Sequence, residues 1–140
     1  MMESWMAEIE DRLRKIGLAV DNYDEGLLLS CCCDKASFDF GDRFRGSPEA
    51  FIAFLSASRL DTLAMDHTIT DISVSIENDY EAISTSAVTA RIVVKIGQKV
   101  QKREVTGRYE DHWSREQSHW LLRARRYSQV NLNIECGQAL

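Results

Sequence analysis

The chain has 140 residues, of which 44% are apolar and 28% charged, and its net charge is −5. This length predicts one domain over residues 1–140, large enough to bury a core without disulfides or a structural metal. An acidic chain has no field that attracts phosphates, so we do not expect nucleic acid as a partner. No stretch approaches the roughly 20 apolar residues that cross a bilayer, and the acidic N-terminus is unlike a signal peptide, so we expect no membrane partner.

The cysteines are unusual in their placement, because three of the four are consecutive. They are Cys31, Cys32, Cys33 and Cys136. Consecutive cysteines do not form a normal disulfide framework, and the C-x-x-C spacing of a zinc site is absent. Packing as small apolar side chains is therefore favoured over redox or metal chemistry. We expect a reducing, cytoplasmic location, with no metal and no organic cofactor.

The first half of the chain carries helical patterns. Apolar residues recur every three to four positions over Trp5–Val20, which predicts one buried helix face, with Ser4 as N-cap. The apolar run Leu27–Cys33 is long enough for a second, shorter helix. Ser47 followed by Pro48 is typical of a helix start and predicts a third helix.

The rest of the chain is dominated by β patterns. A short strand is expected at 37–40. The pattern changes to period two after about residue 65, which predicts a long strand up to Ile76, and further long strands are expected at 80–96, 100–113 and 120–130. Turns are expected at 78–79 and 97–98, a polar loop at 114–118, and a C-terminal tail at 131–140. Helices followed by hairpin-connected strands predict an α+β fold with a strongly curved, mostly antiparallel sheet around about three N-terminal helices. Such a sheet encloses a pocket.

Two side chains at element ends are candidates for chemistry. Asp21 follows the first helical stripe, and it can either cap the second helix together with Asp24 or support a protonated histidine. His67 begins the first long strand, next to small polar residues. It can be structural, or it can move a proton near neutral pH with a carboxylate fixing its tautomer.

His67 can face the same side of the sheet as the apolar residues of its strand only if that strand is irregular. His67 has the opposite parity to Ile72, Val74 and Ile76, so a regular strand cannot direct all four side chains to one face. A β-bulge between His67 and Ile72 would reconcile them, and bulges are frequent beside active sites. The functional interpretation of His67 depends on such a bulge.

The last two strands add polar and aromatic candidates. Tyr109, Asp111 and Trp113 share one face of their strand, and aromatic residues at this spacing are usually core. Arg125 has the parity opposite to Trp120. It can pair with an acid, bind a ligand anion or be solvated.

Several short motifs occur in a characteristic order between about Ile9 and Tyr127. They are V-D-N-Y-D-E-G, F-R-G-S-P-E-A-F, H-T-I-T-D and G-R-Y-E-D-H-W. In order and spacing they resemble the SnoaL-like families of the nuclear transport factor 2-like (cone-shaped α+β barrel) superfamily. The resemblance implies a curved sheet and three helices around a deep hydrophobic pocket, and a homodimer formed through the outer sheet face.

The resemblance also implies a chemistry. Relatives include polyketide cyclases, scytalone dehydratase and hexachlorocyclohexane dehydrochlorinase, and in the last two an aspartate and a histidine form a dyad that removes a proton. Asp21 in V-D-N-Y-D and His67 in H-T-I-T-D match those positions. We therefore expect a cofactor-independent lyase or isomerase (dehydratase- or cyclase-like) acting on a small hydrophobic molecule, with Asp21 and His67 catalytic. The expected substrate-binding residues are Tyr109, Arg125, Asp71 and Trp113.

This resemblance leaves alternatives open. Relatives often have asparagine where this chain has Asp71, so a second carboxylate is expected near the pocket mouth. The superfamily also includes proteins without catalysis, among them small subunits of ring-hydroxylating dioxygenases. A non-catalytic ligand-binding or assembly module is the alternative function.

Overall fold

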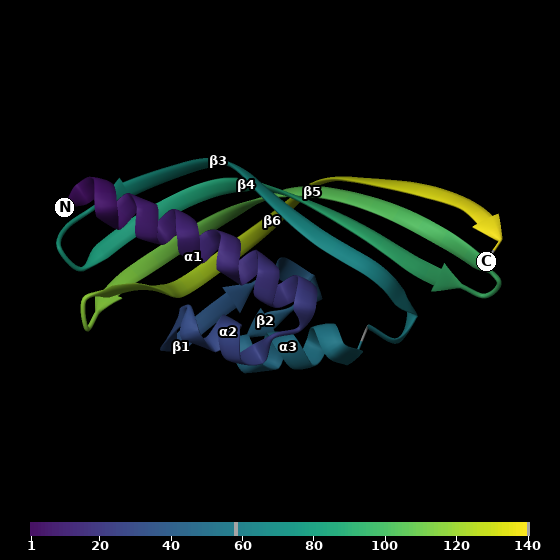
Figure 1. Cartoon of the computed structure of the whole chain (residues 1–140), viewed down its shortest axis with the longest axis horizontal. Coiled ribbons are helices and arrows are strands. Elements are labelled where there is room, and N and C mark those ends of the chain that lie inside the picture. Colours follow the sequence, from purple (N-terminus) through teal and green to yellow (C-terminus); the bar gives the residue numbers. More distant parts are fainter. Residues whose placement is uncertain (58, 140) are drawn as a thin grey trace.

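The computed structural model describes residues 1–57 and 59–139 and consists of one curved sheet with helices on its concave side (Figure 1). The helices are α1 (Met2–Asn22), α2 (Glu25–Ser30) and α3 (Pro48–Ala57), with 3-10 turns η1 (Gly41–Arg43) and η2 (Arg59–Asp61). The strands are β1 (Cys32–Asp39), β2 (Arg45–Gly46), β3 (Thr62–Ile76), β4 (Glu81–Ile96), β5 (Lys99–Glu116) and β6 (His119–Ala139). Their order is β2-β1-β6-β5-β4-β3, and every pairing within the described residues is antiparallel except β1 with β6. The expected α+β class, with a curved and mostly antiparallel sheet around three helices, is confirmed, and the sheet is not closed into a barrel.

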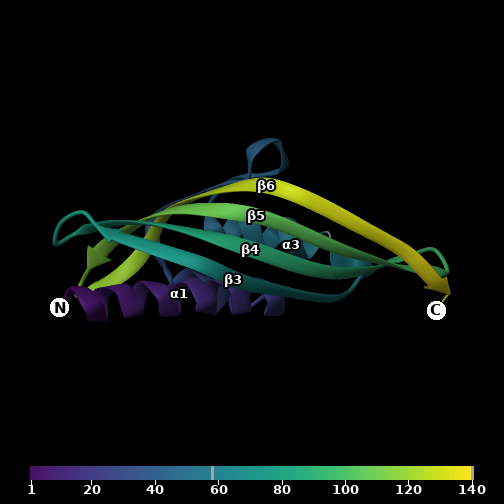
Figure 2. The same cartoon turned by 90° about the horizontal axis from the view of Figure 1, so that it is seen from above.

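Helix α1 crosses the concave side beneath the arched strands (Figure 2). Its buried positions Ile9, Leu13 and Ile16 follow the predicted apolar stripe. Ser4 is not the N-cap: α1 starts at Met2, and the Ser4 hydroxyl donates to the Met1 carbonyl at 2.8 Å. Within the described part of the chain, no helix is long and apolar enough to cross a membrane.

The second helix lies earlier than predicted. Helix α2 ends at Ser30, and Cys32 already belongs to β1. The Asp24 carboxylate caps α2 by accepting a hydrogen bond from the Leu27 amide at 3.0 Å. Asp21 lies inside the last turn of α1 and is not that cap. An apolar run such as this one fits a buried strand as well as a buried helix, so periodicity alone could not separate them.

The expected C-terminal tail is wrong for residues 131–139, which continue β6, while residue 140 lies outside the described residues. Leu132 is paired with Val105 of β5, and the pairing extends to Ala139. The expected loop 114–118 is shorter than predicted. It is a two-residue turn of Gln117 and Ser118 with φ of 51° and 69°, the backbone that matches the twist of a tight hairpin.

Strand β3 contains the bulge on which the interpretation of His67 depends. One extra residue is inserted between Thr70 and Ser73, and Asp71 there has a φ of 52°. Aspartate tolerates this left-handed conformation better than a β-branched residue does. Because the insertion switches the side-chain alternation, His67 and Ile72 both face the concave side. The condition set for the interpretation of His67 is therefore met.

Strand β6 contains similar insertions at Arg123 and Val130, and its register with β5 shifts once more between Cys136 and Ala139. A regular alternation puts Arg125 on the face opposite Trp120 and Leu122, and this prediction is wrong. The insertion at Arg123 turns Arg125 to the concave side, where it is buried. The insertion at Val130 switches the alternation again further along the strand.

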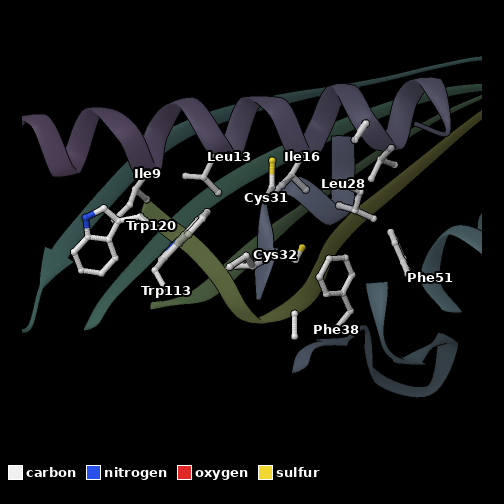
Figure 3. Close-up of a cluster of buried hydrophobic side chains, with 14 of the residues drawn as sticks. Ile9, Leu13, Ile16, Leu28, Cys31, Cys32, Phe38, Phe51, Trp113 and Trp120 are labelled. Carbon is white, nitrogen blue, oxygen red and sulfur yellow. The ribbon is translucent and has the colours of Figure 1, made fainter. Parts of the chain in front are cut away.

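The concave face is divided into a packed half and an open half. In the packed half, large side chains from the sheet meet the first part of α1, and Trp113 and Trp120 are fully buried there (Figure 3). In the open half, the sheet presents Val88 and Ala90 of β4 and Val105 of β5 in place of the two tryptophans. Space therefore remains between the sheet and α3.

Candidate active site

The open half of the concave face forms a pocket of about 370 Å³ between the end of α1, α3 and strands β3–β6. This volume is in the usual range for a small-molecule site. Aliphatic and aromatic side chains make most of the wall. The polar and charged lining residues are Arg43, Thr62, His67, Arg103, Arg125 and Gln129, with the phenols Tyr23, Tyr109 and Tyr127.

Asp21 and His67 meet at the wall of this pocket. His67 Nδ1 lies 2.5 Å from Asp21 Oδ1, and the His67 backbone amide donates to Asp21 Oδ2 at 3.0 Å. Each side chain is only 14% exposed. Both carboxylate oxygens are therefore engaged by one residue, which fixes the imidazole relative to α1 and leaves Nε2 as the ring nitrogen available to the pocket.

A buried ion pair lies further into the pocket. Arg125 donates from Nε to Asp111 Oδ1 at 2.9 Å and from Nη2 to Oδ2 at 3.0 Å. Both side chains are almost completely buried, and the guanidinium stacks on the Tyr109 ring at 3.7 Å from its centroid. Burial raises the pKa of Asp111, while the charge of Arg125 acts in the opposite direction. The two-point contact fixes the plane of the guanidinium at the pocket wall.

Two phenols complete the inner wall. Burial raises the pKa of Tyr109 to about 12, so its hydroxyl remains a proton donor near neutral pH. The Tyr127 ring lies against Gly107, where an added Cβ would clash with Tyr127 Cε1. Glycine at this position lets the ring lie flat on β5 and face the pocket. Tyr109 and Tyr127 are also neighbours, with ring centroids 5.6 Å apart.

The structure brings four of the six expected site residues together: Asp21, His67, Tyr109 and Arg125. It does not bring the other two. Asp71 is exposed in the bulge and is absent from the pocket wall. Trp113 is fully buried in the packed half, where its Nε1 donates to Ser84 Oγ at 2.9 Å. The bulge that turns His67 inward is also the reason why Asp71 points away.

Sequence reasoning missed several lining residues, namely Arg43, Arg103, Tyr127 and Gln129. The sequence around Tyr127 could have indicated that this residue faces inward, because Arg125 and Tyr127 alternate there with solvent-facing residues. The bulges hid this signal by shifting the parity. Arg43 comes from η1, whose position over the sheet depends on tertiary packing.

The described residues hold no group of three or more His, Cys, Asp or Glu side chains arranged to bind a metal ion. All four cysteines are free. Burial raises the pKa of Cys32 to about 12, which keeps this thiol protonated. Cys32 packs in the core beside Phe38 (Figure 3).

The fold and the pocket together are those of an α+β domain with space for a small molecule. Residues 4–126 match the family model of the SnoaL-like domain, and the chain belongs to this family. The resemblance noted from the sequence motifs is confirmed. No curated protein matches the chain in sequence.

Solved structures give the same fold at low identity. A scytalone dehydratase-like protein from Novosphingobium aromaticivorans has a TM-score of 0.81 at 16% identity, covering 96% of this chain and 89% of that one. The Kfla4162 protein from Kribbella flavida has a TM-score of 0.84 at 20% identity, covering 95% of each chain. A hexachlorocyclohexane dehydrochlorinase of LinA type 3 from Novosphingobium barchaimii has a TM-score of 0.83 at 16% identity, covering 96% and 92%. At these identities the likenesses show the fold.

Proposed function

We propose that this protein is a cofactor-independent lyase or isomerase that removes a proton from a small hydrophobic substrate with His67 as general base. The observation that carries the proposal is the 2.5 Å contact between His67 Nδ1 and Asp21 Oδ1 at the wall of an apolar pocket. A carboxylate on one ring nitrogen favours the tautomer whose other nitrogen accepts a proton.

In the proposed reaction, His67 Nε2 takes a proton from a carbon of the substrate. The Asp21 carboxylate supports the imidazolium that forms, and the His67 backbone amide holds the carboxylate in place. The electron pair left on carbon either expels a leaving group on the neighbouring carbon or moves into a conjugated carbonyl. The Tyr109 hydroxyl and the Arg125 guanidinium line the pocket, and both can donate hydrogen bonds to the negative charge that develops on the substrate.

The names of similar structures provide test substrates. One assay measures chloride release from hexachlorocyclohexane. The other follows the dehydration of a β-hydroxy ketone by ultraviolet absorbance. With either substrate, His67→Gln is expected to lower kcat about 10²–10⁴-fold, and Asp21→Asn to lower it by a similar or smaller factor. Asp24→Asn removes a nearby carboxylate outside the dyad and is the matched control, expected to keep full activity.

Deuterium incorporation from heavy water gives a second readout, because a base that removes a proton reversibly also exchanges it. Full turnover by His67→Gln would end the proposal. A bound ligand that is neither converted nor exchanged, with affinity unchanged in His67→Gln, would establish the alternative, a non-catalytic binding module.

We also propose that the protein is cytoplasmic and forms a homodimer through the outer face of the sheet. Four free cysteines support a reducing compartment. The helices all lie on the concave side (Figures 1 and 2), and the outer face of β4 and β5 presents small, partly buried residues such as Ala87, Thr89 and Thr106. Light scattering is expected to give twice the mass of one chain, and Thr89→Lys is expected to give a monomer. A monomeric parent protein would refute the dimer.

A further inference from the structure

The pocket wall is positively charged although the chain is acidic. Three guanidinium groups line it, from Arg43, Arg103 and Arg125. The charge of Arg125 is balanced by Asp111. Among residues 1–57 and 59–139, no carboxylate lies within 4 Å of the other two guanidinium groups. Two cations at the pocket therefore lack a fixed counter-charge.

Arg103 is the more constrained of these two. It is partly buried on the concave face of β5, where its neighbours across the sheet are Ile92 and Ile134. Its Nε donates to Gln101 Oε1 at 2.5 Å, which orients the guanidinium and leaves its outer nitrogens without a partner among the described residues. Arg43 is exposed and donates to Gln129 Oε1 at 3.3 Å. A partly desolvated charge in an apolar wall is unfavourable until an anion pairs with it.

The sheet register gives the distance between Arg103 and the dyad. His67 is paired with Ala90, and Ala90 is paired with Val105, two residues from Arg103 on β5. Two strand spacings and a two-residue rise separate the Cα atoms of His67 and Arg103 by roughly 12 Å. Tyr109 lies in the other direction along β5. The dyad thus stands between an inner phenol and an outer cation.

The wall between these polar ends is aromatic. Phe40 lies 4.9 Å from Phe51 and 5.0 Å from Tyr127, measured between ring centroids, and Phe54 extends this wall along α3. Such a surface favours a flat apolar body, because aromatic rings pack on one another at these separations.

We propose that the pocket binds an amphipathic carboxylic acid, with its apolar, ring-containing body on the aromatic wall and its carboxylate on the guanidinium of Arg103. This ligand class rests on the proposed function, since the same pocket would hold the substrate beside His67. A carboxylate matches the planar guanidinium in geometry and balances its charge. The Arg103 contact would place the reacting carbon of the ligand several bonds away from the carboxylate, toward the dyad.

The test is calorimetric binding of 4-phenylbutanoate and of 4-phenyl-1-butanol, which has the same body without the charge. The acid is expected to bind at least about tenfold more tightly than the alcohol to the parent protein, with an advantage that shrinks as salt is added. Arg103→Met is expected to remove this tenfold advantage and leave alcohol binding unchanged, the loss expected when one charged hydrogen-bonding group is removed. Arg103→Lys is expected to retain part of it.

Lys102→Met is the matched control, because it removes the same charge from the outer face of the same strand. It is expected to change the binding of the acid less than twofold. Equal affinity for acid and alcohol, or an advantage abolished by Arg43→Met but not by Arg103→Met, would overturn the proposal. The His67→Gln variant separates the proposed catalysis from the proposed ligand class, since it should bind the acid normally even though it lacks turnover. If His67→Gln lacks turnover and the parent protein binds acid and alcohol with equal affinity, the catalytic proposal stands and only the ligand class is rejected.

Discussion

Removal of the buried Asp111 carboxylate is expected to be the most destabilising polar substitution in the chain. Asp111 is fully buried and makes two hydrogen bonds to Arg125, which is 3% exposed. In Asp111→Asn the guanidinium stays buried without a counter-charge. Breaking such a pair costs about 3–5 kcal/mol, a large share of the roughly 5–15 kcal/mol that stabilises a domain. For a chain of this length the expected fall in Tm is about 10–20 °C.

The assay is equilibrium urea unfolding followed by circular dichroism, with the m-value as a check that the same surface is exposed on unfolding. Glu110→Gln is the matched control. Glu110 is the neighbouring residue on the outer face, and it pairs with Arg126 at 3.0 Å in solvent. An exposed pair of this kind contributes about 0–1 kcal/mol.

The double substitution Asp111→Leu with Arg125→Met tests whether the loss of stability comes from the unpaired charge of Arg125. Replacing both charges by apolar side chains of similar size removes the unpaired charge, so stability is expected to return to within about 2 kcal/mol of the parent. A loss below about 1 kcal/mol in Asp111→Asn, or a double variant less stable than the single one, would refute the reasoning. Arg125 would then be compensated by something other than Asp111.

Three further predictions concern stability. The folded pKa of Cys32 is raised from 9.0 to about 12, so the stability it contributes is complete below pH 9 and is lost as the pH rises towards 12. The free energy of unfolding from urea titrations should therefore fall by about 2 kcal/mol more for the parent than for Cys32→Val between pH 8 and 10.5, and parallel curves would contradict this. Gly107→Ala should displace the Tyr127 ring and cost about 1–3 kcal/mol in urea unfolding, whereas Gly137→Ala, with no atom within 4 Å of the added Cβ, should change little; equal effects would argue against the close approach. Asp24→Ala should lower stability by about 1 kcal/mol through loss of the α2 cap, and an unchanged Tm would show that the cap is dispensable.

The architecture could be predicted because its signals are local and periodic. The stripe through Ile9, Leu13 and Ile16 fixes the buried face of α1, and serine before Pro48 marks the start of α3, where Ser47 Oγ accepts from the Ala50 amide at 3.1 Å. Long alternating stretches predict β4 and β5 almost to their ends. The boundary between α2 and β1 was wrong because an apolar run without alternation fits both elements.

The site was only partly predictable, because bulges decide which residues face the pocket. For His67 the need for a bulge was visible as a conflict between two parities, and β3 contains it at Asp71. For Arg125 no such conflict was visible, and simple alternation gave the wrong face. An inserted residue leaves no mark in composition or periodicity when its neighbours on both faces are polar.

The sequence by itself determined the class of fold, the buried face of the first helix, the long hairpins and the two residues, Asp21 and His67, that turn out to be in contact. Only the tertiary structure decided that Arg125 pairs with Asp111 inside the sheet, that Asp71 points outward, and that Arg103, which has no ion pair among the described residues, faces the pocket. The physical reason is that side-chain periodicity is local, whereas strand register and bulges are set by the pairing of residues far apart in the chain. One inserted residue reverses every side chain that follows it.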